Sequence, residues 1–152
     1  MRGVMRGVMN RGQRHSIDEQ LLDAPLFRGI SKGEAQLVSS LTTRLEYPAG
    51  SVLARQGDLG REFLIVVHGQ VEVRCDDEIV ASRGPGDHVG EIALLDDCAR
   101  TATLVAKTPV VFDVMAQREF TTLMVEVEGF SNRIHESAAQ RRAELVQSAV
   151  RD

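Results

Sequence analysis

The hydrophobic pattern changes twice along the chain and divides it into three parts. Before residue 42, Ser16 and Ser31 are each followed three residues later by glutamate, which predicts helix starts ahead of short apolar runs. Residues 42–115 hold short β-prone runs separated by groups of Pro, Gly and Asp. After Met115, apolar residues return at helical spacing. The order predicts a mainly β domain with flanking helices.

The middle part predicts an antiparallel sandwich or barrel. In the run 71–75, two valines and a cysteine alternate with glutamate and arginine, which predicts one buried and one solvated face. Asp76-Asp77 predicts a tight hairpin directly after it. The spacing of the turns is typical of an eight-stranded jelly-roll β-barrel. The strands that we expect are 44–47, 51–54, 63–68, 71–75, 78–83, 101–106 and 110–115.

Length and charge predict one domain and argue against nucleic acid as a direct partner. The chain has 152 residues, the usual size of a single domain. Residues 1–15 carry four arginines and no acid, and we expect a disordered basic tail there, with the domain at 16–152. The net charge is −4, so the rest of the chain is distinctly acidic. With no Trp and one Tyr for base stacking, autonomous DNA binding is not expected.

Two further classes of protein are disfavoured. There is no apolar run long enough for a bilayer and no signal peptide, so we expect a soluble, cytoplasmic protein without a membrane partner. The four histidines are solitary, the two cysteines lack Cys-x-x-Cys spacing, and no nucleophile motif occurs. We therefore expect neither an enzyme nor a metal cofactor, and we interpret His88 as a loop residue.

The segment from Gly90 to Arg100 carries the candidate binding chemistry. Gly90 allows the backbone to approach a ligand, and a helical turn that opens at Glu91 directs free amides at an anion. Arg100 follows after a short loop, where its guanidinium can fork onto two phosphate oxygens. Glu91 cannot favour an anion, so its carboxylate suits neutral sugar hydroxyls. The acid and the base could therefore bind different parts of one phosphorylated sugar, the hydroxyls and the phosphate.

Gly90-Glu91-Ile92-Ala93-Leu94 with Arg100-Thr101-Ala102 resembles the phosphate-binding cassette of cyclic nucleotide-binding domains, which occur in the catabolite activator protein, protein kinase regulatory subunits and cyclic-nucleotide-gated channels. The resemblance implies that Glu91 binds the ribose 2′-hydroxyl, that Arg100 binds the cyclic phosphate and that Thr101 lies beside phosphate and purine. Val89 and Ala99 stand where the family often has phenylalanine and proline. Further matching motifs are 47–53, 56–58, 69–73 and 85–87.

The resemblance also implies the ligand, the architecture and the route of regulation. It implies a β-roll (a double-stranded β-helix) at about 42–115 and C-terminal helices at about 116–150. The ligand is cAMP or cGMP, and cAMP is favoured because the chain looks bacterial in style. Ligand binding would move the C-terminal helix against its twin in a homodimer or against an effector domain or protein. No helix-turn-helix precedes Asp152, so we expect any output module elsewhere.

The C-terminal helix leaves two interpretations open for its apolar residues. They either form a dimer seam, through Phe130, Ile134 and Ala138, or pack on the sheet of their own chain. Leu145 or Val146 is the candidate lid over the purine. The alternative function is a fold that has lost its nucleotide and serves as a protein interaction module. Retention of both Glu91 and Arg100 favours nucleotide binding.

Overall fold

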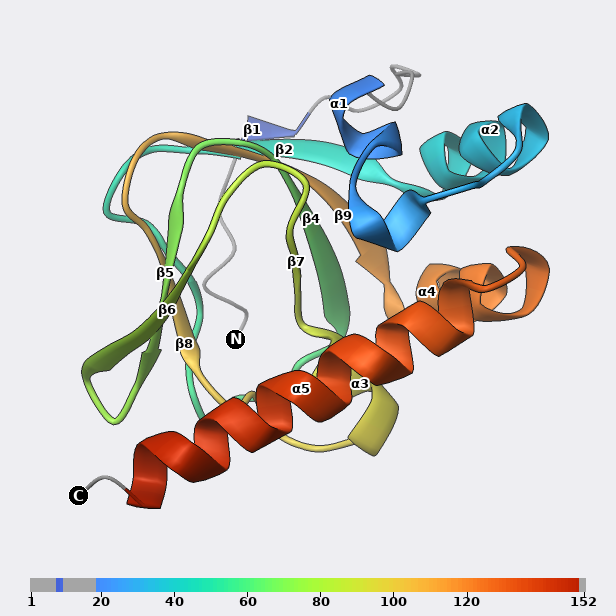
Figure 1. Cartoon of the computed structure of the whole chain (residues 1–152). Coiled ribbons are helices and arrows are strands. Elements are labelled where there is room, and N and C mark those ends of the chain that lie inside the picture. Colours follow the sequence, from blue (N-terminus) through green and yellow to red (C-terminus); the bar gives the residue numbers. More distant parts are fainter. Residues whose placement is uncertain (1–7, 10–18, 151–152) are drawn as a thin grey trace.

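The computed structural model describes the backbone of residues 8–9 and 19–150 and the side chains of residues 21–145. The described part is built on two antiparallel β-sheets with helices at both ends (Figure 1). The predictions for the rest of the tail and for the Ser16 capping box lie outside these residues. The strands are β1 (Val8–Met9), β2 (Thr43–Tyr47), β3 (Val52–Ala54), β4 (Glu62–His68), β5 (Val71–Cys75), β6 (Glu78–Arg83), β7 (His88–Val89), β8 (Thr103–Ala106) and β9 (Val110–Ala116).

The sheet order confirms the predicted jelly-roll. One sheet has the order β1-β2-β9-β4-β7 and the other β3-β8-β5-β6, so strands distant in sequence lie side by side. All seven predicted strands are present, and β2 to β9 form the eight strands of the roll. The sequence did not predict β7, which is two residues long, or β1, which pairs with β2 inside the stretch 1–15.

The β5–β6 hairpin departs in part from its predicted pattern. Asp76 and Asp77 form the expected turn, with φ of 51° and 67°. The predicted alternation of buried and solvated residues is absent, because Val71 is buried and residues 72–75 are all partly exposed. The register with β6 also shifts after Val73. The Gln56 side chain accepts from the Asp76 amide at 2.9 Å and donates to its carboxylate at 3.1 Å, which fixes the tip of the hairpin.

The helices are α1 (Glu19–Leu22), the 3₁₀ turn η1 (Pro25–Phe27), α2 (Lys32–Leu41), α3 (Glu91–Asp96), α4 (Gln117–Glu126) and α5 (Phe130–Val150). The capping box at Ser31 is confirmed: its hydroxyl accepts from the Glu34 amide at 3.0 Å, and the Glu34 carboxylate accepts from the Ser31 amide at 2.8 Å. The C-terminal helical segment is interrupted before Phe130, where Gly129 has φ of +81° and the chain changes direction.

Two hydrophobic cores hold the fold together, and the second one decides how α5 is used. The first lies between the sheets around Leu53 and Phe112. The second lies under the helices and contains Phe27, Phe63 and Phe120, together with Phe130 and Ile134 of α5. Phe130, Ile134 and Ala138 of α5 are all fully buried. For those three residues the sequence left two interpretations open, a dimer seam and packing within the chain. The structure favours packing within the chain, because all three are fully buried in their own chain, and α5 is thereby held across one end of the roll (Figure 1).

Candidate functional site

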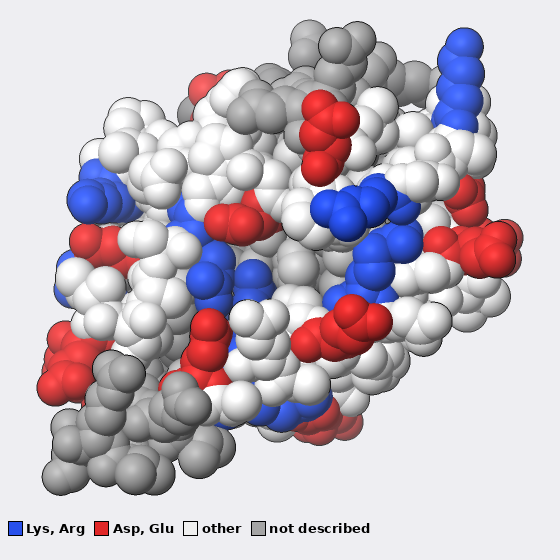
Figure 2. Space-filling model, viewed as in Figure 1, with Lys and Arg blue, Asp and Glu red and all other residues white. Residues whose placement is uncertain are grey.

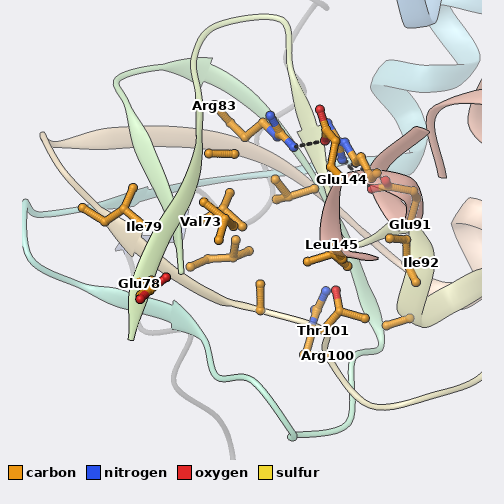
Figure 3. A pocket seen from close by; sticks show the side chains of 18 residues that line it. Val73, Glu78, Ile79, Arg83, Glu91, Ile92, Arg100, Thr101, Glu144 and Leu145 are labelled. Carbon is orange, nitrogen blue, oxygen red and sulfur yellow. Dashed lines mark hydrogen bonds and ion pairs between the residues drawn. The ribbon is translucent and has the colours of Figure 1, made fainter. Parts of the chain in front are cut away.

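A cavity of about 560 Å³ opens between the β5–β6 hairpin, α3 and α5. Figure 3 shows Val73 and Ile79 of the hairpin on one side and Glu91 of α3 on the other. This volume lies in the range of small-molecule sites. The structure brings eight of the nine predicted site residues to this cavity, namely Gly90, Glu91, Ile92, Ala93, Arg100, Thr101, Ala102 and Leu145. The side chain of the ninth, Val146, lies outside the described residues.

Arg100 lies almost fully buried at the cavity wall, with 7% of its surface exposed. Its Nη2 donates to the Glu62 carbonyl at 3.2 Å and lies 3.5 Å from the Glu62 carboxylate. Its Nη1 is buried, and no atom of the described residues accepts its hydrogens. Burial lowers the pKa of Arg100 from its ordinary value, and the charges of Glu62 and Glu91 partly oppose this. A buried cation with an unmet donor is suited to an incoming anion.

Two glycines give the Arg100 side chain its room. A Cβ on Gly90 would lie 2.6 Å from Nη1 of Arg100 and 2.6 Å from the Glu62 carbonyl oxygen, and the φ of Gly90 is +100°. A Cβ on Gly60 would lie 2.5 Å from Nε of Arg100. The backbone is fixed as well, because the Arg100 amide donates to the Asp58 carbonyl at 2.7 Å and its carbonyl accepts from Gly57 at 2.9 Å.

Glu91, the first residue of α3, is 1% exposed and already has a partner. Nη1 of Arg141, from α5, lies 2.8 Å from each oxygen of its carboxylate. One helical position further, Arg142 forks onto Asp96 at the other end of α3, at 2.7 and 3.1 Å. The acid predicted to bind sugar hydroxyls is therefore one of two acids that tie α3 to α5.

The opposite end of the cavity is polar. Arg83, from the end of β6, and Glu144, from α5, both line it, and their charged groups are 4.0 Å apart. Burial lowers the pKa of Arg83, and the neighbouring Arg141 lowers it further. Figure 3 shows this pair at the far end of the cavity from Arg100 and Thr101.

His88 differs from its sequence interpretation. It lies in the strand β7 rather than in a loop, it is buried, and its Nε2 lies 3.0 Å from the Ser137 hydroxyl of α5. Burial lowers its pKa to about 3, with smaller contributions from Arg141 and Arg83, so the ring is neutral at pH 7. A short strand with turn residues on both sides gave no periodic signal by which it could be predicted.

Several residues of the site had no signal in the sequence. Arg141 lies 50 positions from Glu91, and Arg83 lies in a strand pattern where any polar residue would serve. Of the residues that the sequence did not predict, Gly60 was the easiest to find, since it closely follows the Gln56-Gly57-Asp58 motif. None of the described side chains forms a group of three His, Cys, Asp or Glu that could hold a metal ion. Among the described helices, none is long and apolar enough to cross a bilayer.

Comparison with known proteins identifies the family. The model of the cyclic nucleotide-binding domain matches residues 44–126. This chain belongs to the cyclic nucleotide-binding domain family. The cAMP-dependent protein kinase regulatory subunit of Mycosarcoma maydis is 34% identical over 135 residues, an alignment that covers 82% of this chain and 25% of that protein. The chain thus spans about a quarter of the length of that relative.

Solved structures of the family share the fold. The PKAR CBD2 domain with bound Sp-2Cl-cAMPS has a TM-score of 0.79 at 20% identity, covering 86% of this chain and 88% of that one. The regulatory subunit of a cAMP-independent protein kinase A from Trypanosoma brucei has a TM-score of 0.76 at 28% identity, covering 86% and 47%. These neighbours confirm the predicted β-roll.

The prediction that the chain is of bacterial type is wrong. The Mycosarcoma maydis relative is fungal, and regulatory subunits from other fungi match as well. The sequence inference rested on general appearance, since the cassette motif itself carries no information about the organism. The preference for cAMP that was drawn from it loses that support and must rest on other grounds.

Proposed function

We propose that this domain is a non-catalytic sensor that binds a 3′,5′-cyclic nucleotide, with cAMP as its ligand, and transmits binding to α5. The observation that carries the proposal is the buried Arg100, whose Nη1 lacks an acceptor among the described residues at the wall of a nucleotide-sized cavity. The preference for cAMP rests on the relatives, since the Mycosarcoma maydis protein is a cAMP-dependent kinase subunit.

The cavity offers each part of such a ligand a chemically matched partner. The cyclic phosphate would lie against Arg100 and the amides of the first turn of α3, next to Gly90. The ribose 2′-hydroxyl would donate to Glu91. The purine would lie toward the apolar side chains of the hairpin, with Leu145 of α5 as a lid and Thr101 near the phosphate. Thr101 suits cGMP as well as cAMP, so it does not select between them.

Transmission to α5 would follow from the Arg141–Glu91 contact. A ligand that recruits Glu91 competes with, or joins, the Arg141 guanidinium that now holds the carboxylate. The energy of that contact then depends on whether the pocket is occupied, which couples the ligand to the position of α5. The output would be an effector domain or protein, or a second copy of the chain, that contacts the moved helix. Any dimer would use surfaces other than the buried Phe130 and Ile134.

The second candidate is an interaction module that does not use cAMP. The Trypanosoma brucei neighbour is the one observation that bears on it, because that regulatory subunit is from a cAMP-independent protein kinase A, whereas the Mycosarcoma maydis relative is from a cAMP-dependent one. Taken together, the relatives do not favour this alternative. Under this alternative, Arg100 and Glu91 would be part of a structural network only. The two candidates differ in one measurable property, the affinity for cyclic nucleotides.

Calorimetric titration of the purified chain with cAMP, and separately with cGMP, tests the proposal. We expect micromolar or tighter binding that is weakened at least about tenfold in Arg100→Ala, because a charge-assisted contact to phosphate is lost. Arg142→Ala is the matched control, since Arg142 forks onto Asp96 and does not line the cavity. Absence of heat with both nucleotides, at protein concentrations above about 10 μM, would refute the proposal and support the interaction module.

A further inference from the structure

The nucleotide pocket has a second arginine with a buried donor that the protein leaves unpaired. Arg83 is the last residue of β6, and its Nε is buried without an acceptor among the described residues. Among the described side chains that line the pocket, Arg100 is the other one with such a donor. A buried donor without an acceptor is costly, and a ligand that supplies the acceptor removes this cost. The phosphate of the proposed ligand would satisfy Arg100, so Arg83 needs an acceptor from another part of the same molecule.

Three charged groups follow one another along the pocket in the order of the parts of a nucleotide. Burial lowers the pKa of both Arg100 and Arg83, and in both cases the charge of Glu91 opposes this shift. Glu91 is therefore close enough to act on both guanidinium groups. Figure 3 shows Arg100 and Arg83 at opposite ends of the pocket. With the phosphate at Arg100 and the ribose at Glu91, the base would reach the end that holds Arg83.

Glu144, from α5, gives this end of the pocket a hydrogen-bond acceptor beside the donor. Its carboxylate lies 4.0 Å from Nη2 of Arg83, which is longer than a hydrogen bond. The Glu144 side chain is 56% exposed, so few contacts oppose its turning toward a ligand. Figure 2 shows basic and acidic side chains mixed around a hollow on the side of the molecule seen in Figure 1, rather than a patch of one sign. This end of the pocket therefore suits a neutral group that both donates and accepts hydrogen bonds.

Adenine presents such a group along its edge. Its 6-amino group is a donor, and the ring nitrogens on either side of that group, N7 and N1, are acceptors. Guanine has the acceptor O6 at the same position, where a carboxylate would repel it. A guanidinium beside a carboxylate therefore matches adenine when the carboxylate faces the 6-amino group. The preference for cAMP in the proposed function assigns Glu144 to that group.

We propose that Arg83 and Glu144 select the base of the ligand, with Glu144 accepting from the 6-amino group of adenine and Arg83 donating to a ring nitrogen beside it. This inference rests on the proposed function, because it takes cAMP as the ligand and its phosphate at Arg100. It adds the residues that choose the base, since Thr101 suits cAMP and cGMP equally.

Calorimetric titration with cAMP and with cGMP tests the role of Glu144 as a ratio of two affinities. The ligands differ only in the base, so the contributions of phosphate and ribose cancel in this ratio. In the unsubstituted chain we expect cAMP to bind at least about tenfold tighter than cGMP. Glu144→Gln should reduce this ratio at least about threefold, because its amide can donate to O6 of guanine. Glu136→Gln is the matched control, since Glu136 is an exposed acid of the same helix outside the pocket.

Two outcomes of this titration would overturn the proposal. One is a preference of the unsubstituted chain for cGMP, and the other is an equal ratio in Glu144→Gln and in the unsubstituted chain.

The ligands 7-deaza-cAMP and 1-deaza-cAMP, which each lack one ring nitrogen, test the role of Arg83. We expect one of them to bind the unsubstituted chain at least about fivefold more weakly than cAMP, because the acceptor for Arg83 is missing. In Arg83→Met this difference should disappear. Arg74→Met is the matched control, since Arg74 lies in the neighbouring strand β5 and does not line the pocket. Equal binding of all three ligands to the unsubstituted chain, or a difference that persists in Arg83→Met, would refute the assignment.

The titrations separate this inference from the proposed function. If cAMP binds and Arg100→Ala weakens it, while Arg83→Met and Glu144→Gln leave the base preference unchanged, only the assignment of base recognition fails. If the unsubstituted chain binds neither cAMP nor cGMP, the proposed function fails and this inference fails with it. Thermal melting verifies that Arg83→Met is folded, and Glu144→Gln changes an exposed side chain, so the test does not depend on the first variant alone.

Discussion

Substituting Gly60 by alanine tests whether the position of the Arg100 side chain determines phosphate affinity. A Cβ at residue 60 would lie 2.5 Å from Nε and 2.7 Å from Cδ of Arg100, and 2.9 Å from Cβ of Ala93. All three distances are shorter than carbon atoms tolerate. Gly60 does not have a positive φ, so alanine fits its backbone without strain. The substitution therefore acts on its neighbours, and the Arg100 side chain must shift.

The magnitude follows from the contact that the shift removes. A charge-assisted hydrogen bond contributes about 1.5–3 kcal/mol, so displacement of the guanidinium from the phosphate should weaken cAMP binding by roughly 10- to 150-fold. The loss of affinity should approach that of Arg100→Ala without exceeding it. If the guanidinium shifts toward the cavity, it keeps part of its contact with the phosphate, and the loss of cAMP affinity is then at the low end of this range.

Calorimetric titration with cAMP measures this effect, and thermal melting verifies that the variant is folded. Gly33→Ala is the matched control, because Gly33 lies in α2, where the nearest atom to an added Cβ is 3.9 Å away. We expect no change of affinity in the control. A Gly60→Ala domain that is folded and binds cAMP within about twofold of the unsubstituted chain would refute the reasoning that Gly60 positions Arg100 for phosphate.

Three other predictions concern stability. Ile134→Ala should lower the free energy of unfolding by about 2–5 kcal/mol in urea denaturation, since Ile134 is fully buried; a loss below about 1 kcal/mol would contradict its core position. Arg44→Ala should cost about 3 kcal/mol in the same assay, because Arg44 forks onto the buried Asp113 at 2.9 and 3.1 Å, and a neutral effect would contradict this. His88 has a folded pKa of about 3, below its ordinary value of 6.5, so only the unfolded chain takes up its proton and stability falls as the pH decreases from 6.5 toward 3. The slope reaches about 1.4 kcal/mol per pH unit, and urea midpoints at pH 6.5 and 5 should differ less in His88→Gln; an equal difference in both proteins would contradict this account.

The sequence predicted most of the fold because the strands and helix starts depend on local signals. The capping box of Ser31, the Asp76-Asp77 turn and the alternating β-runs act over a few residues, and the structure has elements at all of these places. The short strand β7 has no such signal. The role of the α5 stripe was not decided by periodicity, because the same spacing serves a dimer seam and an internal core. Only the packing of Phe130 against Phe27 and Phe63 distinguishes them.

The candidate site shows the same division. Glu91 and Arg100 belong to one motif, so their presence in one cavity was predictable. Arg141 was not predictable, because its contact with Glu91 spans 50 residues and depends on how α5 crosses α3. Gly60 is a similar case, since its importance arises from the space that the Arg100 side chain needs. Contacts between elements distant in sequence thus determine both which residue pairs with the Glu91 carboxylate and where the Arg100 side chain lies.

In the proposed pocket, Glu91 binds the ribose 2′-hydroxyl of the cyclic nucleotide and Arg100 binds its phosphate. Titration of the unsubstituted chain and of Glu91→Gln, each with cAMP and with 2′-deoxy-cAMP, tests it most directly. In the unsubstituted chain, loss of the 2′-hydroxyl should weaken binding by about tenfold or more, because a hydrogen bond to a charged acceptor disappears. In Glu91→Gln the weakening caused by removing the 2′-hydroxyl should be several-fold smaller, since the acceptor is neutral. An equal penalty for the deoxy ligand in both proteins would contradict the assignment of Glu91 to the ribose.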